Sequence, residues 1–185
     1  MIKVLKHFLS DAECNQLVTW VEQNHHMFAD ANMNGNRKTT RYHTTGIVFP
    51  ELAKKIREDI KKNLHLEDKL TPPFIDGMVC SYAYPGDTCY EHIDPEWHEG
   101  YYTLHCNVII QKPDSGGNVV IEGKEYSLDR GDLICFYVSE LNHSVTEVMG
   151  DTPRLMWIFG FCVDKKADWH EYYAKKKITC DPYVY

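Results

Sequence analysis

Three residues of this chain carry side chains that bind metal ions, at a spacing that suits one shared site. His92 and Asp94 are separated by a single residue, and His143 follows much later in the chain. Residues two apart in a β-strand project from the same face, so His92 and Asp94 would lie side by side. Two imidazoles and one carboxylate on one face of an ion are the ligand set of non-haem Fe(II) sites, which keep the opposite coordination positions open. We therefore predict that these three residues bind iron; the alternative for His92 and Asp94 is a solvated pair at a strand end.

Arg154 is the second candidate for chemistry. It lies in the apolar segment Pro153–Phe159, which reads as a strand, and an uncompensated guanidinium in such a segment would be costly. A planar guanidinium can hold a carboxylate through two parallel hydrogen bonds, so Arg154 predicts a site for an anionic ligand. The alternative is a surface arginine or an ion pair with an acid such as Asp151.

Two helices are predicted before residue 75. Ser10–Glu13 is a capping-box sequence, and a second helix is predicted from Pro50, a favoured first helical residue. Residues 30–45 between them are polar and rich in asparagine, which predicts a loop. Each helix would carry an apolar stripe suited to packing on a sheet; the stripes are Cys14, Leu17, Val18 and Val21, then Leu52, Ile56, Ile60 and Leu64.

From residue 75 the pattern changes to short strands separated by glycine and aspartate turns. Such spacing favours a double-sheet jelly roll or barrel over an alternating βαβ fold. We predict a single domain over residues 1–185, with a helical support segment at 1–74, a β core at 75–163 and a tail at 164–185 that forms a terminal helix. The predicted strands are Met78–Tyr84, Tyr102–Gln111, Asn118–Glu122, Lys124–Leu128, Asp132–Val138 and Leu155–Val163.

Composition narrows the setting of the protein. The net charge of −7 argues against general nucleic-acid binding. Seven cysteines without a C-x-x-C pair suit reduced thiols better than a disulfide framework. The N-terminus lacks the apolar run of a signal peptide, and no stretch reaches membrane-spanning length. We expect a soluble cytoplasmic protein without membrane association; the oligomeric state is open.

Six motifs follow one another along the chain: Tyr84-Pro85-Gly86-Asp87, His92-Ile93-Asp94, Gly116-Gly117-Asn118, Asp129-Arg130-Gly131-Asp132-Leu133, His143 and Arg154. Taken together, they resemble the Fe(II)/2-oxoglutarate-dependent dioxygenases, and within them the prolyl-4-hydroxylase-like group. The resemblance runs from about residue 78 to 161. It implies a double-stranded β-helix, a jelly roll with the metal between its sheets and supporting N-terminal helices, in agreement with the mainly β pattern with flanking helices (α+β) predicted above. The glycines of these motifs are expected at turns.

The resemblance also implies a co-substrate site. It assigns His92, Asp94 and His143 to iron, and Arg154 to the distal carboxylate of 2-oxoglutarate. Tyr82 stands where the family often has a tyrosine lining the co-substrate pocket. His105 and Asn107 share one face of the next predicted strand and are further candidates, together with Thr103, for contact with the co-substrate. For Tyr82 and Asn107, packing within the sheets is an equal alternative. The family often has a tyrosine near the position of Asn107, so that contact differs here.

The implied activity is hydroxylation of an unactivated C–H bond with Fe(II), 2-oxoglutarate and molecular oxygen, yielding succinate and carbon dioxide; ascorbate is a further reductant that the resemblance allows. The expected substrate is a prolyl residue of a peptide or a small amino-acid-like metabolite. Two segments are candidates for covering the mouth of the site, the basic loop Arg37–Tyr42 and the loop Pro95–Tyr101 with Trp97, and ordinary solvated loops are the alternative for both. The alternative of another class is a non-catalytic, metal-containing jelly-roll binding or sensor module, similar to cupins. Arg154 separates the two hypotheses, since only the enzyme needs a site for a 2-oxo acid.

Overall fold

The computed structural model describes residues 1–31, 40–43, 48–66 and 77–165. The predicted terminal helix of the tail and residues 37–39 of the basic loop at 37–42 lie outside the described residues, and residues 40–42 belong to a strand. The architecture is mainly β with two α-helices and antiparallel sheets, as the sequence predicts. None of the described helices is long and apolar enough to cross a membrane.

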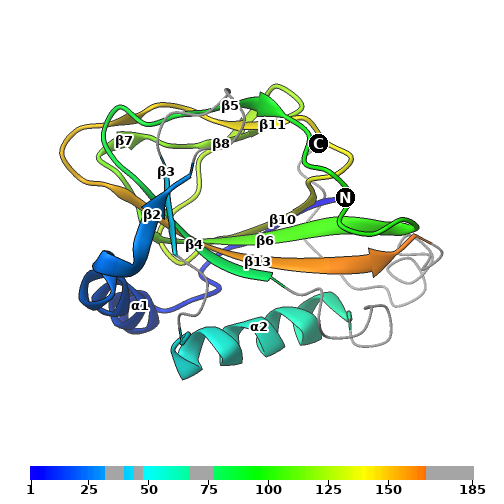
Figure 1. The fold of residues 1–185 in the computed structure, drawn as a ribbon, viewed down its shortest axis with the longest axis horizontal. Coiled ribbons are helices and arrows are strands. Elements are labelled where there is room, and N and C mark those ends of the chain that lie inside the picture. The colour runs from blue at the N-terminus through cyan, green and yellow to red at the C-terminus, as the bar shows by residue number, and fades with distance from the viewer. Residues whose placement is uncertain (32–39, 44–47, 67–76, 166–185) are drawn as a thin grey trace.

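The strands form two facing sheets, with the helices on the outer face of the larger one (Figure 1). The large sheet has the order β1-β10-β6-β13-β4-β3-β2, and the small sheet has the order β5-β11-β8-β9. A further pair consists of β12 (Val148–Met149) and β7 (Ser115–Gly116). The strands of the large sheet are β1 (Ile2–Leu5), β2 (Phe28–Asp30), β3 (Thr40–His43), β4 (Gly77–Ala83), β6 (Tyr101–Gln111), β10 (Leu133–Tyr137) and β13 (Arg154–Asp164); those of the small sheet are β5 (Cys89–His92), β8 (Val119–Ile121), β9 (Lys124–Tyr126) and β11 (His143–Val145).

The two predicted helices are present. Helix α1 (Asp11–Gln23) begins after Ser10, whose side chain and that of Glu13 make the reciprocal hydrogen bonds of a capping box. Helix α2 (Glu51–Leu64) begins after Pro50, and a short 3₁₀ helix (His25–Met27) follows α1. The prediction of a plain loop at 30–45 is wrong, because β3 lies there and pairs with both β2 and β4. This pairing is long-range, so the local composition of the segment does not indicate it.

Strand β13 shows how the sheet separates the core from the site. Alternate residues of a strand face opposite sides. Trp157, Phe159 and Phe161 are fully buried against the helix layer, whereas Met156 and Ile158 face the small sheet. Strand β13 therefore forms one wall of the cavity between the sheets, while its other face is packed in the core. Arg154 is its first residue.

Asp132, in one of the six motifs, has a structural function. Its buried carboxylate accepts hydrogen bonds from Lys6 Nζ (2.6 Å), from the backbone N–H of His7 (3.0 Å) and from that of Asp129 (2.7 Å). It therefore ties the end of β1 to the start of β10.

We expect Asp132→Ala to lower the free energy of unfolding by about 2–3 kcal/mol, because donors near the core lose a charged acceptor. Urea denaturation at neutral pH measures this. Asp129→Ala, which changes an exposed carboxylate beside the same Lys6, serves as the control and should lower the free energy of unfolding far less, because solvent screens surface ion pairs. Equal losses in the two variants would contradict this function for Asp132.

Candidate metal and co-substrate site

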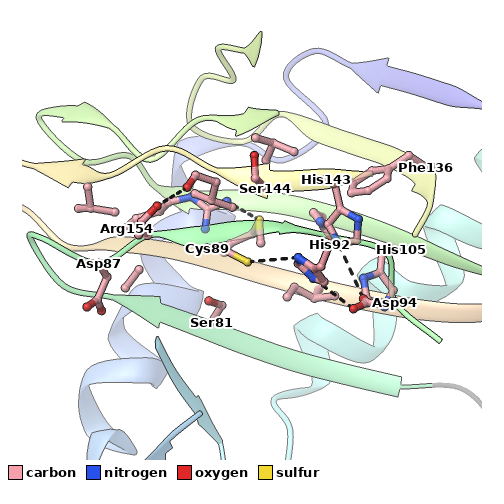
Figure 2. A pocket seen from close by; sticks show the side chains of 18 residues that line it. Ser81, Asp87, Cys89, His92, Asp94, His105, Phe136, His143, Ser144 and Arg154 are labelled. Atoms are coloured by element: carbon pink, nitrogen blue, oxygen red, sulfur yellow. Dashed lines mark hydrogen bonds and ion pairs between the residues drawn. The ribbon is translucent and has the colours of Figure 1, made fainter. Parts of the chain in front are cut away.

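The three predicted metal ligands come together at the edge of the small sheet (Figure 2). His92 ends β5 and is the register partner of His143, the first residue of β11. Asp94 follows β5 and points its carboxylate between the two rings: Oδ1 is 3.2 Å from His92 Nε2, and Oδ2 is 3.8 Å from His143 Nε2. One ligand atom from each residue lies within 4.8 Å of the others. The pairing of β5 with β11 thus brings residues distant in the sequence onto one site.

Hydrogen bonds to the backbone orient both imidazoles. His92 Nδ1 lies 2.8 Å from the carbonyl oxygen of Tyr90, and His143 Nδ1 lies 3.0 Å from that of Leu141. A carbonyl oxygen only accepts, so each Nδ1 carries the proton and donates it. In the neutral ring each Nε2 is then unprotonated, and its lone pair is directed towards the carboxylate of Asp94. Metal-binding histidines are held in this way, and the donor set fits a divalent ion of the Fe(II) type.

The charges of the triad are strongly coupled. The hydrogen bond with Asp94 raises the pKa of His92 to about 10, with a smaller contribution from Cys89. Burial alone would raise the pKa of Asp94, but the hydrogen bond from His92 and the nearby His105 and His143 lower it overall. At neutral pH the metal-free triad therefore holds a proton on His92, and a metal ion must displace it.

This coupling predicts a proton release on metal binding. Between pH 6.5 and about 10, His92 is protonated in the folded protein without metal, so Ni²⁺ binding at pH 8 should release about one proton from this residue. Calorimetry in two buffers with different ionisation enthalpies measures it, and His92→Ala should abolish it. Because the folded pKa is raised, His92 stabilises the metal-free fold fully below pH 6.5, and this contribution is lost as the pH rises towards 10. Metal binding without net proton release in the parent would contradict the coupling.

A cavity between the sheets joins the triad to Arg154. The triad lies towards one end and Arg154 towards the other (Figure 2). The Arg154 side chain is 2% exposed, which excludes a surface arginine, and its guanidinium donates to Met156 Sδ at 2.9 Å. A buried cation at one end of a cavity and a metal site at the other suit a ligand with two anionic ends.

Two further predicted residues, His105 and Asn107, line the same cavity from β6. Asn107 is 5% exposed, and its Oδ1 is buried without a hydrogen-bond partner among the described residues. A buried amide normally has its hydrogen bonds satisfied, so this group is poised for a bound molecule. The oxygen and nitrogen of the amide exchange places by rotation about the last side-chain bond, so the site can present either an acceptor or a donor.

Tyr82 is not among the residues that line the cavity, and its position corresponds to the alternative given for it above, packing within the core. Its ring lies on the other face of β4, near the rings of His25 and Tyr84, and packs against the core beneath the helices. Its neighbours Ser81 and Ala83 line the cavity instead, because adjacent residues of a strand face opposite sides.

Sequence reasoning also missed Ser81, Cys89 and Ser144, all of which line the cavity. Cys89 Sγ lies 3.8 Å from His92 Nδ1. The two-residue period of β4 could have indicated Ser81, because Ser81 and Ala83 share the face of the strand opposite to Tyr82. Thr103 instead accepts a hydrogen bond from the backbone N–H of Trp97, which holds the loop after Asp94 against β6.

No protein-family model and no curated protein matches this chain in sequence. Among solved structures, the chain is similar to a viral collagen prolyl hydroxylase from Paramecium bursaria Chlorella virus 1, solved with 2-oxoglutarate, at 15% identity and a TM-score of 0.67, covering 88% of this chain and 96% of that one. A prolyl hydroxylase from Trichoplax adhaerens, in complex with a peptide fragment of hypoxia-inducible factor, matches at 16% identity and a TM-score of 0.65, covering 89% and 84%. HygX from Streptomyces hygroscopicus, with nickel and 2-oxoglutarate bound, matches at 11% identity and a TM-score of 0.63, covering 88% and 82%. The TM-scores show that the chain shares the jelly-roll fold of these structures.

Proposed function

We propose that this chain is an Fe(II)/2-oxoglutarate-dependent dioxygenase that hydroxylates an unactivated C–H bond. One observation carries the proposal: a His-Asp-His triad and a buried arginine lie at the two ends of one cavity between the sheets. The shared fold supports it, because structures with this fold were solved with 2-oxoglutarate and with nickel.

The residues of the chain have separate functions in this proposal. His92, Asp94 and His143 hold the iron, which supplies oxygen activation coupled to decarboxylation of 2-oxoglutarate to succinate. Arg154 binds the distal carboxylate through its planar fork. Asn107 donates or accepts a hydrogen bond within the cavity, and His105 lies beside Asp94 at the metal end. Oxygen is the second co-substrate, and ascorbate is a reductant that keeps the iron in the ferrous state.

For the substrate, we propose a prolyl residue of a peptide, with a small amino-acid-like metabolite as the second candidate. The similar structures support a peptide substrate in general, since one was solved with a peptide fragment, and another with the small molecule hygromycin B shows that this fold also accepts non-peptide ligands. We further propose a reducing, cytoplasmic location, because five cysteines that the structure describes are free thiols: Cys14, Cys80, Cys89, Cys106 and Cys135.

The test is direct binding followed by turnover. Under anaerobic conditions, Fe(II) and 2-oxoglutarate together should give the weak visible charge-transfer band of the chelate, and Zn²⁺ in place of Fe(II) is the spectroscopic control. Peptides and small molecules are then screened for substrate-stimulated succinate formation. If the metal-loaded protein does not bind 2-oxoglutarate, the dioxygenase proposal fails and the metal-containing binding module takes its place.

A further inference from the structure

Resting on the proposed function, we infer that Gly117 is a positioning residue that sets how far Arg154 reaches towards the metal, and so selects the length of the 2-oxo diacid. Gly117 belongs to the Gly116-Gly117-Asn118 motif, whose glycines the sequence assigns only to a turn. In the structure, Gly117 faces the stem of Arg154.

The contact is too close for any other residue. A Cβ atom at Gly117 would lie 2.9 Å from Arg154 Cδ and 2.9 Å from Pro113 Cγ. The backbone cannot easily retreat, because the N–H of Gly117 donates to the carbonyl oxygen of Glu147 at 3.0 Å. The absent side chain of Gly117 therefore leaves the space that the arginine stem occupies.

Gly117 also lies on the side of Arg154 that faces away from the metal. Arg154 lines two cavities: the one that contains the triad, and a small one of about 10 Å³ lined by Gly117, Pro113 and Asn118 but by none of the triad. That second space holds no more than about one water molecule, so the stem has little room to move into it. A methyl group on Gly117 would push the guanidinium towards the triad.

The distance between guanidinium and metal decides which ligands fit. A 2-oxo diacid would be held at both ends, by the metal at its 2-oxo acid end and by Arg154 at its distal carboxylate. Displacing one of the two anchors by about 1 Å is enough to lower the affinity for the ligand by a large factor, because the ligand must fit both anchors at once. A shortened gap therefore disfavours the five-carbon 2-oxoglutarate relative to the four-carbon oxaloacetate.

The experiment compares Gly117→Ala with Gly123→Ala. Both glycines have left-handed backbone, with φ of +64° and +74°, so the conformational strain of alanine is matched. A Cβ atom at Gly123 meets no described atom within 4 Å. Binding of 2-oxoglutarate and of oxaloacetate to the Ni²⁺-loaded proteins is measured by calorimetry, together with thermal unfolding. Gly117→Ala should weaken 2-oxoglutarate about tenfold or more and shift the affinity ratio towards oxaloacetate. Gly123→Ala should lose stability with an unchanged ratio.

The outcomes separate the inference from the proposed function. A Gly117→Ala protein with the parent's affinity ratio overturns the inference alone, even if both affinities fall. A parent that binds neither diacid overturns the proposed function and the inference with it. If Gly117→Ala does not fold, it is combined with Val148→Ala, which removes the methyl group 3.4 Å from the added Cβ, and the ratio is read against Val148→Ala alone.

Discussion

His92→Ala, Asp94→Ala and His143→Ala should each abolish 2-oxoglutarate turnover and strongly weaken iron binding. Each substitution removes one of three protein ligands that converge within 4.8 Å. Loss of an outer hydrogen-bond partner of a ligand already costs roughly 10- to 100-fold in metal affinity, and loss of the ligand itself should cost more. The fold should survive, because the triad lies at the sheet edge, away from the core between the large sheet and the helices.

Succinate formation and anaerobic Fe(II) titration measure the effect, with circular dichroism to check folding. Glu91→Ala is the matched control, because Glu91 is an exposed acid beside His92 on the same strand and does not line the cavity. A variant that keeps oxygen-dependent succinate formation at the parent's rate would remove its residue from the ligand set.

Arg154→Ala should raise the concentration of 2-oxoglutarate needed for half-maximal turnover by roughly thirty-fold or more. Truncating one partner of a desolvated charge pair costs on the order of 2–5 kcal/mol, since the other charge stays buried. Arg154 is buried at the far end of the cavity from the triad, so iron affinity should change little. Arg154→Lys should recover part of the loss, because it keeps the charge but not the planar fork.

Arg57 provides a matched control for this experiment. It is another largely buried arginine, but it belongs to α2 and lies over the ring of Phe161, on the helix side of the large sheet. Arg57→Ala should lower stability and leave 2-oxoglutarate binding as it is. If Arg154→Ala binds 2-oxoglutarate as tightly as the parent, the distal carboxylate is anchored elsewhere.

Features that depend on local patterns and on residue type could be predicted from the sequence alone. The capping box and apolar stripes predicted α1 and α2, and the turn residues predicted most of the β core, because such signals act within a few residues. The metal triad was also predictable, since few residue types bind iron and the His92-x-Asp94 spacing places both side chains on one face of a strand.

Which neighbours of these residues face the site depends on long-range strand pairing and could not be predicted from the sequence. Ser81 lines the cavity and Tyr82 does not, because the register of β4 with β13 sets the face of every residue on the strand, and a shift of one residue would reverse it. Strand β3 exists because β2 and β4 pair with it, although its sequence reads as loop. The contact between Gly117 and Arg154 likewise joins segments that only packing brings together, and a glycine motif carries no local sign of the side chain that it accommodates.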